Sequence, residues 1–76
     1  MKAIYTSEEL EFAIFCIENI AAALKIKPLK VYKLLTEDSD ILHTYIIPEY
    51  EMLHTQSKEY IIDDIIEFMR ESGVAV

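Results

Sequence analysis

The hydrophobic residues of this chain recur at helical spacing, and few residues interrupt them. One glycine, Gly73, and two prolines, Pro28 and Pro48, are the only strong breakers in 76 residues. Between them, apolar side chains return every three or four positions, which is the period of an amphipathic α-helix. The pattern therefore predicts an all-α fold. We expect one small domain over residues 1–76, a compact bundle of four to five short helices with the N-terminal helix at its centre.

The first predicted helix runs from Ser7 to Lys25. Thr6 and Ser7 are suitable N-caps, and Glu9 stands three residues after Thr6, as in a capping box. At about 100° per residue, one arc of about 120° holds Glu8, Glu11, Glu18, Asn19 and Lys25. The apolar residues occupy the remaining wide face, which predicts a helix contacted by neighbours on several sides.

Phe15 departs from this division, because it falls inside the polar arc, between Glu11 and Glu18 on one side and Asn19 on the other. Scattered exposed apolar residues are normal, but a Phe in a polar stripe also fits a subunit interface. A further layer of the fold that covers the stripe is the competing interpretation. A domain of this length buries only about 60% of its unfolded surface, so we expect a homodimer.

Four further helical segments follow, over residues 28–35, 41–46, 49–54 and from 56 or 57 up to Gly73. Pro28 suits the first turn of a helix, and Asp40 is a suitable cap for the segment after it. Pro48 disfavours helical geometry at Ile47, which predicts a break or kink there. Gly73 suits the C′ position that ends the last helix.

The predicted core consists of one set of apolar side chains from these helices: Ile14, Ile17, Leu24, Leu35, Leu53, Ile62, Ile65 and Met69. Two short apolar tails, Ala3–Tyr5 and Val74–Val76, allow a small strand pair as a minor alternative.

Acidic residues line one side of the last predicted helix. Glu59, Asp63, Glu67 and Glu71 are each four residues apart, opposite an isoleucine-rich face. Like charges at this spacing destabilise an isolated helix by about 0.2–0.5 kcal/mol per pair. The row is interpreted either as a solvated face or as a docking surface for a basic partner; a straight ridge of carboxylates does not converge on a cation.

Tyr60 and Asp64 lie beside this row, and Tyr60 would serve as an aromatic anchor. With Phe15 included, the candidate partner-binding residues are Phe15, Tyr60, Asp63, Asp64, Glu67 and Glu71.

The charge balance limits the classes of partner that we expect this protein to bind. Fourteen Asp and Glu against seven Lys and Arg give a net charge of -7. An acidic domain is a poor general binder of nucleic acid and of anionic membranes, whereas a basic protein partner is favoured. The longest apolar stretch, 12–24, contains Glu18 and is too short to span a bilayer. The start of the chain does not resemble a signal peptide, and a single cysteine fits a reducing cytoplasm, where we expect this protein.

Classical catalytic side chains are few. Cys16 lies on an apolar side of the first helix, which predicts a buried, inert thiol. Leu-His-Thr occurs at 42–44 and again at 53–55, but two histidines without a close third ligand indicate a metal only weakly. We expect His54 to be a partly buried hydrogen-bonding residue and His43 to lie on the surface. We expect no enzyme activity, no cofactor and no metal.

Residues 21–35 resemble a helix-turn-helix, with small residues on one helix, a short turn and a second helix. Four of the seven positive charges lie here or close by, including Lys27, Lys30 and Lys33. This favours, as an alternative function, a DNA-associated regulator that uses these three lysines. The turn lacks glycine and the chain is acidic, so the other interpretation is a structural helical corner.

Several sequence stretches resemble a family of short bacterial proteins that is known as a domain of unknown function. They are Tyr45-Ile-Ile-Pro-Glu-Tyr50, Leu53-His-Thr-Gln56 and Tyr60-Ile-Ile-Asp-Asp-Ile65, preceded by Phe15-Cys-Ile-Glu18 and Val31-Tyr32. The resemblance covers roughly residues 10 to 72 and implies no catalytic residue. It implies an accessory or neutralising partner of a larger bacterial protein. The function expected from the sequence is therefore a non-enzymatic protein-interaction module.

Overall fold

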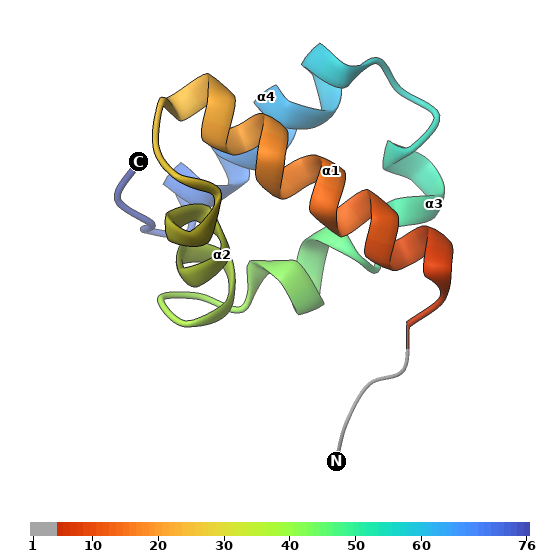
Figure 1. The fold of residues 1–76 in the computed structure, drawn as a ribbon, viewed down its shortest axis with the longest axis horizontal. Coiled ribbons are helices and arrows are strands. Elements are labelled where there is room, and N and C mark those ends of the chain that lie inside the picture. The colour runs from red at the N-terminus through yellow and green to blue at the C-terminus, as the bar shows by residue number, and fades with distance from the viewer. Residues whose placement is uncertain (1–4) are drawn as a thin grey trace.

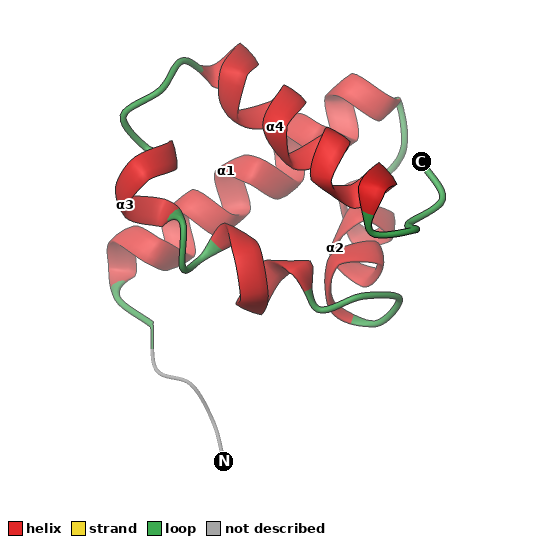
Figure 2. Cartoon of the chain, turned by 180° about the vertical axis from the view of Figure 1, so that it is seen from behind, coloured by secondary structure: helices red, strands yellow, loops and turns green. Residues whose placement is uncertain are grey.

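Five helices follow one another in the computed structural model, which describes residues 5–76. They are α1 (Ser7–Leu24), α2 (Pro28–Thr36), the π-helix η1 (Leu42–Ile46), α3 (Tyr50–Leu53) and α4 (Lys58–Glu71). α1 crosses the whole molecule, and α4 crosses it on the opposite side (Figures 1 and 2). α1 packs against both α2 and α4. The predicted all-α bundle with a central N-terminal helix is confirmed.

The ends of α1 are fixed by hydrogen bonds to its capping residues. The Thr6 backbone N–H donates to Glu9 Oε1 over 3.0 Å, and the Glu9 N–H donates to Thr6 Oγ1 over 3.1 Å, which is the predicted capping box. At the other end, the Ile26 N–H donates to Ala21 O over 3.0 Å. Lys25 lies between them in the left-handed region, with a φ of 59°. α1 therefore ends one residue earlier than predicted, in a Schellman motif.

The same motif ends α4, with a different residue at its turning point. Ser57 Oγ accepts a hydrogen bond from the Tyr60 N–H and starts the helix. Gly73 turns the chain with a φ of 90°, and the Val74 N–H donates to Met69 O over 2.9 Å. Gly73 is thus the predicted C′ residue. Residues 74–76 form no strand, and the other half of the strand pair considered above falls partly outside the described residues.

The core lies where α1, α2, η1 and α4 meet. Its fully buried side chains are Val31, Leu35, Ile46, Ile65, Met69, Cys16 and Ile20. Leu35, Leu53, Ile62, Ile65 and Met69 were predicted in the core and are buried, whereas Ile17 and Leu24 are half-buried at its edge.

Ile14 does not belong to the core, and its prediction there is wrong. Its side chain is 55% exposed. The covered side of α1 is centred near Cys16, and a residue two positions away points about 160° around the helix from it. The periodicity of α1 shows that its apolar face is wide, but the neighbouring helices cover only one part of that face.

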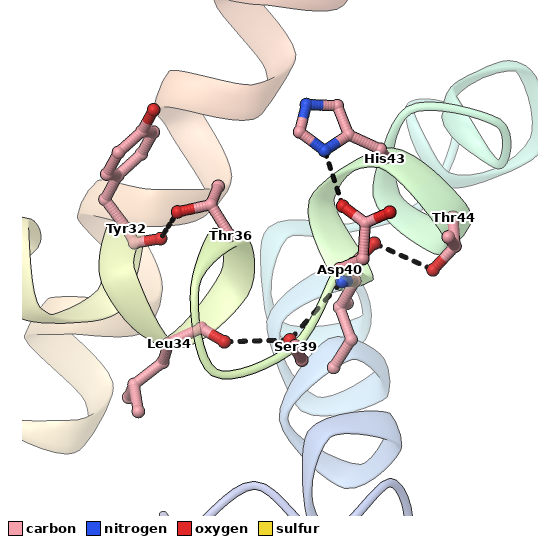
Figure 3. A network of polar contacts seen from close by, with 8 residues as sticks. Tyr32, Leu34, Thr36, Ser39, Asp40, His43 and Thr44 are labelled. Atoms are coloured by element: carbon pink, nitrogen blue, oxygen red, sulfur yellow. Dashed lines mark hydrogen bonds and ion pairs between the residues drawn. The ribbon is translucent and has the colours of Figure 1, made fainter.

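The loop between α2 and η1 is held by short side-chain hydrogen bonds (Figure 3). Ser39 Oγ donates to Leu34 O over 2.8 Å, and Thr44 Oγ1 donates to Asp40 O over 2.8 Å. The Asp40 carboxylate lies 2.7 Å from His43 Nδ1 and is not recorded as capping a backbone N–H. Asp40 therefore begins the next turn through its backbone oxygen, not as the side-chain cap that we predicted.

The chain keeps helical geometry up to Pro48. Ile47 has a φ of -71° and a ψ of -44°, and its N–H donates to Leu42 O, five residues back, over 3.1 Å. Ile47 itself therefore keeps helical dihedral angles, but the predicted break is found at this point, because η1 ends at Ile46 and α3 begins only at Tyr50. The π-turn is wider than an α-turn, and Pro48, which has no N–H to donate, follows directly after it.

Candidate functional site

The acidic row on α4, defined as Glu59, Asp63, Glu67 and Glu71, is fully on the surface. All four side chains are exposed, and the isoleucines on the other side of α4 are buried. Within residues 5–76, the one ion pair joins His43 to Asp40. No residue of the acidic row forms an ion pair in the described part of the chain, and α4 presents the row to solvent, with Arg70 of the same helix offsetting only part of its charge.

Asp64 lies on the same helix but in a different environment from Asp63. It is half-buried, and its Oδ2 accepts a hydrogen bond from the Tyr45 hydroxyl over 2.5 Å. The Tyr45 ring stacks on Phe68, with 4.0 Å between ring centroids. Of the candidate partner-binding residues, Asp64 is thus the one with a side-chain hydrogen bond inside the fold.

Tyr60 stands at the surface beside the acidic row, with 52% of its side chain exposed. It lines a shallow hollow of about 100 Å³ that also includes Tyr45, Met52 and Asp64. This hollow is too small for a cofactor, since ligand pockets commonly measure about 300–1,000 Å³. The exposed ring of Tyr60 is available to a partner that contacts the acidic row.

Phe15 is half-buried and packs against the core. Its ring lies 6.2 Å from the Phe12 ring, and Phe12 in turn meets the edge of Tyr50. The half-buried ring agrees with the competing interpretation, in which the fold itself partly covers the polar stripe of α1. The large apolar side chains that α1 exposes are Leu10, at 48%, and Ile14.

A groove between α1 and α4 was not anticipated from the sequence. It encloses about 320 Å³. Its lining consists of Asn19, Ala22 and Ala23 from α1 and Lys58, Glu59, Ile62 and Asp63 from α4. The two alanines are exposed and Ile62 is buried, and most of the lining surface is apolar, with charged and amide side chains beside it. The alanine run at 21–23 was the sequence signal, because small residues leave space between two helices.

The potential catalytic side chains do not converge. Cys16 is completely buried, and burial raises the pKa of its thiol to about 12, so it stays protonated at neutral pH. His43 is exposed beside Asp40. His54 is exposed and stacks on Tyr50 at 4.5 Å, so the prediction of a partly buried hydrogen-bonding residue is wrong. Across residues 5–76, no group of three or more His, Cys, Asp or Glu side chains is arranged to hold a metal ion.

The lysines of the second candidate surface are all exposed. Lys27 precedes α2, and Lys30 and Lys33 lie on it, beside the exposed side chains of Leu29 and Tyr32. α2 follows α1 after a short turn, as the helix-turn-helix interpretation requires, but the turn is made by Lys25 in the left-handed region. In the described part of the chain these lysines pair with no carboxylate.

Comparisons with known proteins identify a family. No helix in the part of the chain that the structure describes is both long and apolar enough to cross a bilayer. No curated protein and no solved structure matches the sequence significantly. Residues 11–72 match a family model described as "Protein of unknown function (DUF3791)", which agrees with the extent of the resemblance found in the sequence. The chain therefore belongs to the DUF3791 family.

Proposed function

We propose that this protein is a non-enzymatic protein-interaction module that binds a basic partner through the acidic row of α4. The observation that supports this most directly is the exposed row itself, which has no cationic partner within residues 5–76. A positively charged surface placed against it would gain charge complementarity and would remove the repulsion along the helix.

The surroundings of the row are suited to recognition. The buried isoleucines of α4 hold the helix against the core, so its four carboxylates are presented on a fixed scaffold. Tyr60 adds an exposed aromatic ring at one flank, and aromatic residues are frequent among the side chains that dominate binding energy. An accessory or neutralising partner of a larger bacterial protein is the biological role that fits such a surface.

Charge reversal tests this proposal. The tagged protein is used to capture partners from a lysate of the producing cell, in parallel with the double variant Glu67→Lys/Glu71→Lys. The matched control is Glu11→Lys/Glu18→Lys, which makes the same charge change on the exposed side of α1. We expect a stoichiometric basic partner that the α4 variant loses and the control retains, with circular dichroism unchanged. Equal capture by both variants would remove the acidic row from the function.

DNA association is the second candidate function, because Lys27, Lys30 and Lys33 are exposed and unpaired in the described chain. It requires salt-sensitive binding to duplex DNA that is lost when the three lysines are replaced by alanine. A mobility-shift assay at low salt decides this. If the native protein does not shift the mobility of duplex DNA, the proposal of DNA association is wrong.

We propose a homodimer as the assembly state. Leu10 and Ile14 lie one helical turn apart on α1 and are both about half exposed. They, and not the half-buried Phe15, supply the apolar surface that a second subunit would cover.

A further inference from the structure

We infer that the groove between α1 and α4 seats one large apolar side chain of a basic peptide segment. This inference rests on the proposed function and names the form of the partner: a segment with cations on one face and a single apolar anchor beside them. The juxtaposition that carries it is an apolar hollow, formed by Ala22, Ala23 and Ile62, directly bordered by Glu59 and Asp63 of the acidic row.

The size and lining of the groove select the anchor. A volume of about 320 Å³ lies within the usual range of ligand pockets, about 300–1,000 Å³, and leaves room for a large apolar side chain. Ile62 is buried while Ala22 and Ala23 are exposed, so an entering side chain would meet apolar surface on both helices. An apolar side chain gains free energy there in proportion to the area that it removes from water.

The charges at the rim of the groove favour a positively charged segment on either side of the apolar anchor. Glu59 and Asp63 stand one helical turn apart on the groove's edge, and the acidic row continues from them to Glu67. Lys58 is the single cation of the lining. A segment with Lys or Arg at matching intervals would meet two carboxylates beside the anchor and further carboxylates along α4. An acidic segment would meet repulsion, so the groove favours a basic occupant.

Asn19 contributes the remaining polar group of the rim. Its Nδ2 donates to Phe15 O over 2.8 Å, which holds the side chain against its own helix. The amide is therefore kept at the edge of the groove, and the hollow beside Ala22 and Ala23 stays open to an anchor.

Defined peptides test the inference. The probe is an alanine-based helical peptide with lysine at every fourth position and one leucine beside the lysine row. Its companions replace the leucine by alanine or all lysines by glutamate. Binding is followed in amide NMR spectra of the protein. We expect the leucine peptide to shift the amide signals of Ala22, Ala23 and Ile62 and to bind about tenfold more tightly than its alanine companion. The glutamate peptide should cause no shift.

Protein variants complete the test. Ala23→Leu fills the groove without changing charge, and we expect it to remove the advantage of the leucine peptide. Ala75→Leu makes the same substitution at an exposed alanine outside the groove and should leave that advantage intact. If circular dichroism shows that Ala23→Leu does not fold, the affinities of the leucine and alanine peptides for the native protein still decide whether the groove binds an apolar anchor.

The outcomes distinguish an error in the inference about the groove from an error in the proposed function of the acidic row. Equal affinities for the leucine and alanine peptides, both weakened by Glu67→Lys/Glu71→Lys, overturn the groove and retain the proposed function. Binding that charge reversal does not weaken, or no binding at millimolar peptide, overturns both. A fall in oligomeric state caused by Ala23→Leu without peptide shows that a second copy occupies the groove, and it also overturns the inference.

Discussion

The Tyr45 hydroxyl donates a hydrogen bond to Asp64 Oδ2 over 2.5 Å and so joins η1 to the middle of α4. The same tyrosine ring stacks on Phe68, one turn further along α4. One side chain therefore makes both a polar and an apolar contact between two elements that are far apart in the sequence. Asp64, although it adjoins the acidic row, is engaged within the fold.

Replacing Tyr45 by Phe keeps the stacked ring and removes the hydrogen bond. We expect Tyr45→Phe to lower the free energy of unfolding by about 1 kcal/mol, because Asp64 loses its donor at a half-buried position. Urea denaturation followed by circular dichroism measures the change. Tyr32→Phe is the control, since Tyr32 is exposed, lies outside the hollow that Tyr45 lines, and forms no hydrogen bond through its hydroxyl within residues 5–76. A loss in the control as large as that in the variant would contradict the role of the hydrogen bond.

Alkaline pH provides a second test of the same contact. Burial, and after it the hydrogen bond and charge of Asp64, raises the pKa of Tyr45 above its ordinary value near 10. The unfolded chain then releases this proton at lower pH than the folded protein does. The stabilisation by Tyr45 is complete below pH 10 and declines as the pH rises further. We expect the unfolding free energy to fall less steeply above pH 10 in Tyr45→Phe than in the native protein, and parallel curves would refute this.

The thiol of Cys16 should be unreactive in the native protein. It is completely buried, and burial raises its pKa to about 12, so almost no thiolate is present at pH 8. We expect modification by a thiol-specific chromogenic disulfide to be at least about a hundredfold slower than in urea, because it requires an unfolding event. Fast labelling of the folded protein at pH 8 would show that the thiol is accessible.

Lys25 occupies the left-handed turning position after α1, where Gly73 stands after α4. A side chain with a Cβ is strained at a φ of 59°, so Lys25→Gly should raise the unfolding free energy by about 0.5–1 kcal/mol. For a domain of this size that corresponds to a rise of a few degrees in Tm. Glu37→Gly is the control, because Glu37 is exposed and ends α2 with a φ of -104°, where glycine relieves no left-handed strain. Stabilisation of both variants alike would exclude relief of backbone strain.

Leu10 and Ile14 form the exposed apolar pair of α1. If they form the dimer interface, Leu10→Ser/Ile14→Ser should convert the dimer to a monomer with little change in the circular dichroism spectrum. Light scattering coupled to gel filtration measures this. Leu29→Ser/Met52→Ser, which changes two other exposed apolar residues, should remain dimeric. A native protein that elutes as a monomer would dismiss the homodimer.

Local chemistry explains which parts of the fold were predictable. The helix ends at Thr6, Ser57 and Gly73 are fixed by hydrogen bonds between residues a few positions apart, such as those between Thr6 and Glu9. The sequence alone therefore locates these helix ends. The acidic row is local in the same sense, since its spacing and the isoleucines opposite it decide which side faces water.

Features that depend on distant neighbours were not predictable. Ile14 is exposed although it was predicted in the core, because the neighbouring helices cover only part of the wide apolar face of α1. His54 is exposed, with its ring stacked on the half-buried Tyr50, and neither its exposure nor this stacking follows from the sequence pattern. The groove exists only where Ala22 and Ala23 meet Ile62 from the other end of the chain, which a periodicity in one helix does not reveal.

The acidic row also couples recognition to the internal motions of α4. Its carboxylates repel one another at every turn, and none of them forms an ion pair within residues 5–76, so the repulsion reduces the stability that the buried face gives to the free helix. A positively charged ligand removes that repulsion without touching the core. Amide hydrogen exchange along residues 58–71 would then slow when a basic ligand binds the acidic row. The helix would open least often in the complex, where the ligand neutralises its carboxylates.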